Sequence, residues 1–235
     1  MIENLPFYVS AIFILTTFLT VSFFLFAVKR AISSSTLAKF LNFLILFWLL
    51  FQGFLAISGF YLNTDSIPPR LPVFAVFPAF ILIVFLFIFF RKSLVKRLPL
   101  KTLTLLHVVR VPVELVLWQL FQNRQVPQLM TFEGRNFDIL AGITAPLIAW
   151  LAFRNGKTNR PLLIVWNIFA LILLFNIVIN ALLSFPSPFQ QFAFDQPNRA
   201  VQYFPFVWLP SIIVPIVLFA HLASLWQLIK NVSKP

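Results

Sequence analysis

Four residues that could do chemistry share one face of an apolar segment. The stretch TLTLLHVVRVPVELVLWQLFQ, residues 102–122, carries His107, Arg110, Glu114 and Trp118 at spacings of three, four and four. At about 100° per residue, these spacings place all four side chains on one face of a helix. A charge at the centre of a bilayer costs on the order of 3 kcal/mol or more. We therefore expect this face to line a bundle interior or a water-filled cavity.

Arg110 and Glu114 are an i, i+4 pair and are predicted to neutralise one another. Pro112 lies between them. Because proline has no N–H and its ring displaces the carbonyl four residues earlier, a kink is expected at the depth of the charges. Similar disruption is expected at the other prolines inside apolar segments: Pro78, Pro146, Pro210 and Pro215.

Ionisable residues inside a membrane usually mark functional sites, so this stripe is predicted to bind a ligand or to relay protons. The alternative is an ion pair that only fixes helix packing. His221, in the last apolar segment, lies at a depth where it could meet His107. Two histidines and one carboxylate are too few for a metal or haem site, so no metal and no cofactor are expected. Asn176 and Asn180, one turn apart, would extend the stripe outward if they face inward.

The segments that must position these residues are strongly apolar. Of 235 residues, 60% are hydrophobic and 10% are charged, more apolar surface than a soluble domain can bury. Cysteine is absent, which excludes disulfides, thiolate ligands and a cysteine nucleophile. Since a spanning helix needs about 20 residues, we predict one all-α polytopic domain over residues 1–235. Its seven helices are expected near 7–29, 38–61, 72–91, 102–122, 136–154, 161–184 and 207–230.

The net charge of +12 is explained by topology. Thirteen of the 18 Lys and Arg residues fall in alternate connections, and no acid accompanies them there. By the positive-inside rule, the N-terminus is outside and the C-terminus cytoplasmic, in the plasma (inner) membrane. The basic connections are expected to contact anionic lipid headgroups, and no nucleic acid is needed to explain them.

Charged residues are also expected around an outer mouth: Glu133, Arg135, Asp138, Asp195 and Arg199. Asn136 is the expected N-cap of the fifth helix, with Asp138 in its first turn. The connection 185–206 is long and rich in Phe and Pro. It is predicted to lie at the membrane surface as an aromatic belt or to fold over the bundle as a lid.

Three functions remain open. The first is binding or transport of a small solute in an outward-opening polar pocket, coupled to protons through Glu114 and His107. The second is an intramembrane enzyme acting on a lipid or another apolar substrate, with Arg110 as an anion anchor. No hydrolase motif is present, and no catalytic residue is assigned. The third is a structural or assembly subunit. A cavity that reaches the stripe would favour the first, and a solid outer half would contradict it.

Overall fold

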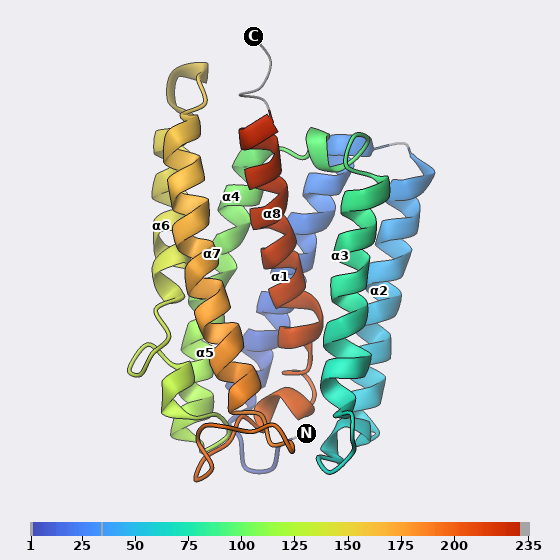
Figure 1. Ribbon diagram of the computed structural model, residues 1–235, viewed down its shortest axis with the longest axis vertical. Helices are drawn as coiled ribbons and strands as arrows, with labels where there is room; N and C mark the ends of the chain where they lie inside the picture. Colours follow the sequence, from blue (N-terminus) through green and yellow to red (C-terminus); the bar gives the residue numbers. More distant parts are fainter. Residues whose placement is uncertain (1, 34, 231–235) are drawn as a thin grey trace.

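The structure, a computed structural model, describes residues 2–33 and 35–230, and within them the chain forms helices and irregular connections but no β-strand. Six helical units are long and apolar enough to cross a membrane, and a seventh apolar helix is shorter. The predicted all-α class is therefore confirmed, with six to seven helices of membrane-spanning character. They stand side by side in one bundle (Figure 1).

The helices are α1 (Phe7–Ile32), α2 (Thr36–Ile57), α3 (Phe77–Phe89), α4 (Leu100–Leu106), α5 (Arg110–Gln122), α6 (Ile139–Ala152), α7 (Arg160–Leu183) and α8 (Val214–Lys230). Two π-helical turns, η2 (Pro72–Val76) and η8 (Leu209–Ile213), precede α3 and α8. One 3-10 turn, η4 (His107–Val109), joins α4 to α5 in a single span. The connections contain further 3-10 turns: η1 (Phe60–Leu62), η3 (Val95–Arg97), η5 (Gln128–Met130), η6 (Arg154–Gly156) and η7 (Ala200–Gln202).

Two helices are shorter than predicted. The helix expected over 38–61 ends at Ile57, because Gly59 adopts the left-handed conformation with φ of 75°. The helix expected over 136–154 is α6, Ile139–Ala152. It begins three residues later than predicted because the side chains of Asn136 and Asp138 bond to residues of α5, and neither side chain caps α6.

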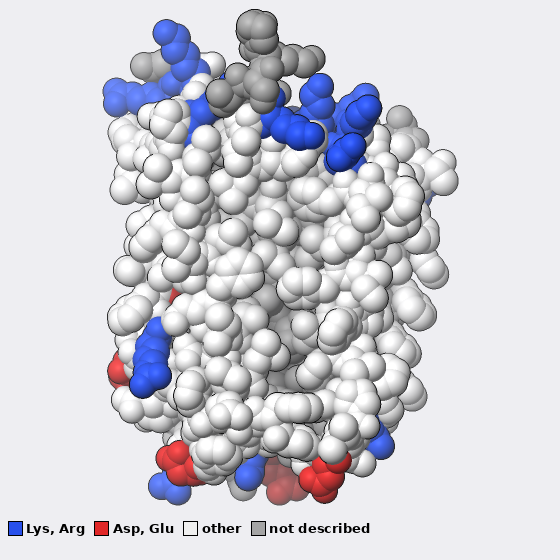
Figure 2. Space-filling model, in the orientation of Figure 1, with Lys and Arg blue, Asp and Glu red and all other residues white. Residues whose placement is uncertain are grey.

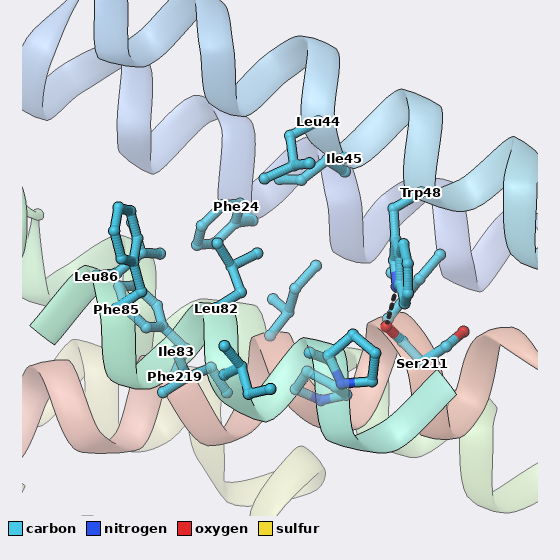
Figure 3. A pocket seen from close by; sticks show the side chains of 16 residues that line it. Phe24, Leu44, Ile45, Trp48, Leu82, Ile83, Phe85, Leu86, Ser211 and Phe219 are labelled. Atoms are coloured by element: carbon cyan, nitrogen blue, oxygen red, sulfur yellow. Dashed lines mark hydrogen bonds between the residues drawn. The ribbon is translucent and has the colours of Figure 1, made fainter. Parts of the chain in front are cut away.

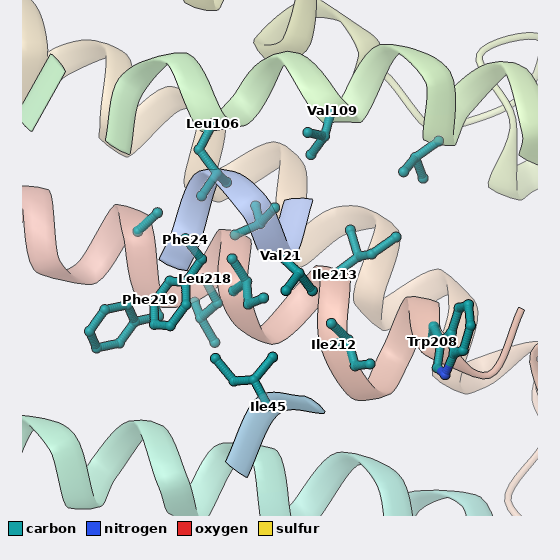
Figure 4. Packing of buried hydrophobic residues seen from close by; sticks show 14 of the residues in the cluster. Val21, Phe24, Ile45, Leu106, Val109, Trp208, Ile212, Ile213, Leu218 and Phe219 are labelled. Carbon is teal, nitrogen blue, oxygen red and sulfur yellow. The ribbon is translucent and has the colours of Figure 1, made fainter. Parts of the chain in front are cut away.

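The core forms where α1, the α4–α5 span and α8 meet. Figure 4 shows Phe24 of α1, Leu106 of α4 and Phe219 of α8 gathered there, and the rings of Phe24 and Phe219 meet edge to face at 5.6 Å. In lipid, such packing contributes through van der Waals contact, since lipid tails are as apolar as the side chains. The buried span carrying Arg110 and the buried α8 therefore form the inner layer of the bundle.

Small residues let α6 approach this layer closely. Ala141, Ala145 and Ala149, spaced four apart, are buried on one face of α6. Gly142 lies against the start of α5, where an added Cβ would stand 2.8 Å from Val111 Cγ2 and 2.9 Å from Val111 N. This close contact sets the register between α6 and α5.

The expected disruption is seen at four of the five prolines. Pro78 and Pro215 each follow a π-helical turn, and Pro112 follows the 3-10 turn at His107–Val109. Pro210 lies inside the second π-helical turn. By contrast, α6 continues through Pro146 as an α-helix.

Side chains of α2 satisfy two carbonyls that these prolines leave without a helical donor. Gln52 Nε2 donates to the carbonyl of Phe74, four residues before Pro78, at 2.9 Å. Trp48 Nε1 donates to the carbonyl of Ser211, four residues before Pro215, at 3.0 Å. Within the membrane such groups need a protein partner, because water is absent. Tyr61 donates to Gln52 Oε1 at 2.6 Å, and burial raises the pKa of its hydroxyl, which keeps it a donor.

Charge is separated between the two ends of the bundle. Figure 2 shows Lys and Arg crowded over the upper end with no acid among them, whereas the lower half carries acids together with a few basic side chains; a largely uncharged band lies between. The upper end, called the basic end below, is formed by the last turn of α1, the α3–α4 connection and the α6–α7 connection. Lys234, predicted on the same side, lies outside the described residues.

Candidate functional site

A buried ion pair lies at the centre of the site. Arg110 Nε donates to Asp138 Oδ2 at 2.6 Å, and Arg110 Nη2 donates to Asp138 Oδ1, so the contact is bidentate. Nη2 also donates to the carbonyl of Ala170 at 3.0 Å. The predicted Arg110–Glu114 pair is thus wrong: among the described residues, the ion pair of Arg110 is with Asp138. Asp138 is the N-cap residue of α6, and both of its carboxylate oxygens accept hydrogen bonds from the guanidinium group of Arg110.

Asp138 is therefore not a residue of an exposed mouth. It is buried at the N-cap of α6, and its carboxylate makes no capping bond. Its backbone N–H donates to Asn136 Oδ1 at 3.0 Å. Asn136, the expected N-cap, instead donates from Nδ2 to Glu114 Oε1 at 2.6 Å and to the carbonyl of Met130 at 3.0 Å.

Glu114 is left with one free oxygen. Its side chain is buried, and Oε2 has no hydrogen-bond partner among the described residues. Buried polar atoms are rarely left without a partner, since each costs about 1–3 kcal/mol. We therefore treat Glu114 Oε2 as the atom of this site that a bound group would satisfy. Arg110, Glu114, Asn136, Asp138 and His221 are called the polar cluster below.

The hydrogen bonds of His221 fix its tautomer. Its Nε2 lies 3.3 Å from Arg110 Nη1, and a guanidinium can only donate, so Nε2 must accept. Its Nδ1 therefore carries the proton and donates to Asn167 Oδ1 at 2.8 Å. Asn167 Nδ2 in turn donates to the carbonyl of Leu163. His221 is consequently neutral while it contacts Arg110.

The two histidines do meet. The rings of His107 and His221 are stacked with centroids 3.8 Å apart and 19° between the planes, and Trp166 lies edge-on to His107 at 5.3 Å. Both nitrogens of His107 are buried and unpartnered within the described part of the chain. Because ring nitrogens bind metals in the plane of the ring, stacked imidazoles offer no shared metal position. The described residues contain no group of three or more His, Asp or Glu that could hold a metal.

A cavity of about 180 Å³ reaches the polar cluster. Arg110, Glu114 and Asp138 line it together with apolar side chains from both flanking helices, such as Phe80 of α3 and Ile177 of α7. Figure 2 shows the surface hollowed in its lower half, where α3 and α7 stand apart in Figure 1. The site therefore combines a small polar region with a long apolar wall, and it lies between two helices at the periphery.

The π-helical turns form part of this wall. Pro72 and Val76 of η2, with Leu209 and Ile213 of η8, line the cavity. π-Turns inside helices are rare and occur often at functional sites, because they widen the local backbone.

Three residues lie outside the cavity lining: Trp118, predicted as part of the stripe, and Asn176 and Asn180, predicted to extend it if they face inward. Trp118 Nε1 donates to Glu133 Oε1 at 2.9 Å, and Asn176 Nδ2 donates to the carbonyl of Arg135 at 2.7 Å. Asn180 donates to the carbonyl of Asn176 at 3.0 Å. Trp118 and Asn176 thus hold the α5–α6 connection against α5 and α7, while Asn180 bonds within α7.

The segment 185–206 covers the end of the bundle opposite the basic end. Gln196 Nε2 donates to the carbonyls of Phe121 and Val126 at 3.1 and 2.6 Å, and Gln202 Nε2 donates to that of Tyr61 at 2.8 Å. Asn198 from this segment lines the cavity. The segment is thus a hydrogen-bonded cover, and its opening as a lid stays a prediction.

The charged residues expected in this region have different places. Asp195 and Arg199 are exposed, and the backbone N–H of Arg199 donates to the carbonyl of Gln125 at 3.1 Å. Glu133 and Arg135 are exposed on the α5–α6 connection. None of these four lines the cavity.

The sequence reasoning missed Asn136 and Asn167 as partners of the charged groups. Asn136 stands two residues before Asp138 and was assigned to helix capping, which is the common role of that residue type. Its link to Glu114 becomes visible only when α6 is placed beside α5.

One family model, described as Domain of unknown function (DUF8737), matches residues 68–229. This range contains the whole polar cluster and both walls of its cavity. No curated protein and no solved structure matched the chain. The matched range spans more than half of the chain, so the protein belongs to this family.

Proposed function

We propose that this member of the DUF8737 family is an integral membrane protein that binds, and moves across the bilayer, a small lipophilic molecule with a hydrogen-bond donor or a positive charge. The observation that carries this proposal is the cavity of about 180 Å³, which is walled by apolar side chains and reaches Glu114. Pockets with apolar walls and a few placed polar groups are typical ligand sites.

The charges of the site favour a donor over an anion. Arg110 is already paired with Asp138, so it has little attraction left for a phosphate or carboxylate. Glu114 Oε2 is the free polar atom, and a carboxylate oxygen accepts hydrogen bonds. A ligand amine or hydroxyl would satisfy it. The same balance argues against an enzyme that uses Arg110 as an anion anchor.

Access is proposed from the side, between α3 and α7, because the segment 185–206 covers the end of the cavity. A lipophilic molecule dissolved in the bilayer could use this route. Proton coupling is proposed to run through Glu114, which lines the cavity. His107 lies behind Arg110, stacked on His221, and does not line it.

The direct test is binding to the full chain in nanodiscs, measured with three fluorescent probes that share one apolar body and carry an amine, a hydroxyl or a carboxylate. Glu114→Gln should weaken amine binding by about 10–100-fold, the value of a hydrogen bond to a charged group. Ile177→Trp should fill the cavity and block the amine and hydroxyl probes.

Ile179→Trp is the matched control, because Ile179 lies two residues along α7 and is exposed on the outside of the bundle. Stronger binding of the carboxylate probe than of the amine would contradict the proposal. Equal binding by the Ile177 and Ile179 variants would contradict it as well.

We also propose that the basic end is cytoplasmic, with the N-terminus outside, in the plasma membrane. The separation of charge between the two ends supports this orientation. Since the chain has no cysteine, single variants can be labelled without background. A membrane-impermeant maleimide applied to intact cells should label Ser187→Cys and leave Lys157→Cys unlabelled until the cells are opened. The reverse pattern would overturn the orientation.

A further inference from the structure

A second cavity lies on another side of the bundle and shares no part of the polar cluster. It measures about 320 Å³ and lies between α2 and α3, with α1 and α8 behind it. Figure 3 shows Leu44 and Ile45 of α2 on one side of it and Leu82 of α3 on the other, with Phe24 of α1 between. We call this cavity the α2–α3 groove.

The groove offers a ligand no polar group. Trp48 Nε1 is already bonded to the carbonyl of Ser211, and the Ser211 hydroxyl donates to the carbonyl of Val207 at 2.8 Å. The remaining lining residues are apolar, and two of them, Ile81 and Phe85, are also exposed on the outer surface of α3. In a bilayer, a groove of this kind is in contact with hydrocarbon chains.

Basic side chains stand at one end of the groove. Lys39 lies in the first turn of α2, and Arg91 and Lys92 follow directly after α3; all three are exposed. Arg91 follows the lining residue Leu86 by five positions, about 8 Å along a helix. Figure 2 shows Lys and Arg gathered over the upper end of α3 and no acid beside them on this face.

We infer that the α2–α3 groove holds an acyl chain of an anionic phospholipid, whose phosphate lies among Lys39, Arg91 and Lys92. The groove itself accepts any acyl chain. The charges at its end select the headgroup, because each Lys or Arg near the surface attracts an anionic lipid. None of the polar cluster lines this groove, and Pro215 is the lining residue that it shares with the cavity beside Glu114.

The first arm of the test concerns the headgroup. The full chain, purified in detergent, is titrated with phosphatidylglycerol and with phosphatidylcholine of identical acyl chains, and bound lipids are counted by native mass spectrometry. Arg91→Gln/Lys92→Gln should weaken phosphatidylglycerol binding about thirtyfold, from two charges, and leave phosphatidylcholine unchanged. The control Arg154→Gln/Lys157→Gln removes two charges from the α6–α7 connection at the same end.

The second arm concerns the groove. Leu82→Trp should fill it and reduce phosphatidylglycerol retention, whereas Val84→Trp, exposed on the same helix and outside the lining, should not. Equal losses from the two charge variants would show that net charge alone acts, which overturns a defined site. Unchanged retention in Leu82→Trp, with the protein folded, would overturn the acyl-chain position.

Discussion

The ion pair between Arg110 and Asp138 makes a quantitative prediction. Asp138→Asn keeps the size of the side chain and one acceptor oxygen, but it removes the charge that neutralises Arg110 and half of the bidentate contact. Breaking a buried ion pair from one side costs about 3–5 kcal/mol, because the other charge stays buried without compensation. Since one acceptor oxygen remains in Asp138→Asn, we expect the lower end of this range, a loss of about 3 kcal/mol of unfolding free energy.

The assay is equilibrium unfolding of the purified protein in mixed micelles, followed by circular dichroism. A loss of about 3 kcal/mol corresponds to more than a hundredfold change in the unfolding constant. The control is Asp195→Asn, an exposed acid in the segment 185–206, which should change stability by less than about 0.5 kcal/mol.

A double variant separates pairing from general damage. Arg110→Met/Asp138→Leu removes both charges and keeps apolar volume, so it should be more stable than Asp138→Asn. Equal unfolding free energies for the Asp138 and Asp195 variants would refute the buried pair. A double variant less stable than the single one would refute the claim that the uncompensated charge of Arg110 causes the loss.

Two further predictions concern packing. Gly142→Ala should destabilise the protein by about 1–3 kcal/mol, because its Cβ would lie 2.8 Å from Val111 of α5. The control Gly53→Ala should be close to neutral, since nothing lies nearer than 3.5 Å to its Cβ. Equal effects of the two variants in thermal denaturation would contradict this prediction. Gln52→Leu should cost about 1–3 kcal/mol, because it leaves both the Phe74 carbonyl and the Tyr61 hydroxyl unpaired. The cost should be smaller in a Pro78→Ala background, which restores a backbone donor for the carbonyl alone; additive costs in a double-mutant cycle would contradict the reasoning.

The inward face of the α4–α5 span could be predicted from sequence, because three ionisable residues at helical spacing cannot face lipid cheaply. The structure buries His107, Arg110 and Glu114 together. The partner of Arg110 could not be predicted in this way. Sequence spacing favours Glu114, the i+4 carboxylate, as the partner of Arg110. Tertiary packing can bring a carboxylate from another helix closer to the guanidinium, as it does with Asp138. The sequence predicts Asp138 as a first-turn acid that stabilises its own helix, because helix N-termini often carry an acid.

The chemical character of the cavity was also beyond the sequence. A stripe of His, Arg and Glu indicates a polar pocket, yet most of the lining is apolar. The reason is that most polar atoms of the cluster satisfy one another, with Glu114 Oε2 as the exception: Arg110 bonds Asp138 and His221, and Asn136 bonds Glu114 Oε1. What remains open to the cavity is mainly the hydrocarbon of the neighbouring helices.

The length of α6 links these features. Its 14 residues extend about 21 Å, which is short of the roughly 30 Å of a bilayer core, so α6 alone is shorter than a full membrane span. Figure 1 shows α6 ending well above the lower ends of α5 and α7. The irregular backbone of this connection has protein partners, since Asn136 and Asn176 donate to the carbonyls of Met130 and Arg135.

Asn136 therefore has two tasks, since the same amide that supports the connection also bonds Glu114 Oε1. A ligand that donates a hydrogen bond to Glu114 Oε2 would bind the same carboxylate whose Oε1 accepts from this amide. Through Asn136, the ligand binding proposed beside Glu114 would be coupled to the position of the α5–α6 connection and of Asp138, whose N–H donates to Asn136 Oδ1. The Arg110–Asp138 ion pair, Glu114 and the α5–α6 connection share one hydrogen-bond network through Asn136, so a substitution at one of them is expected to perturb the others.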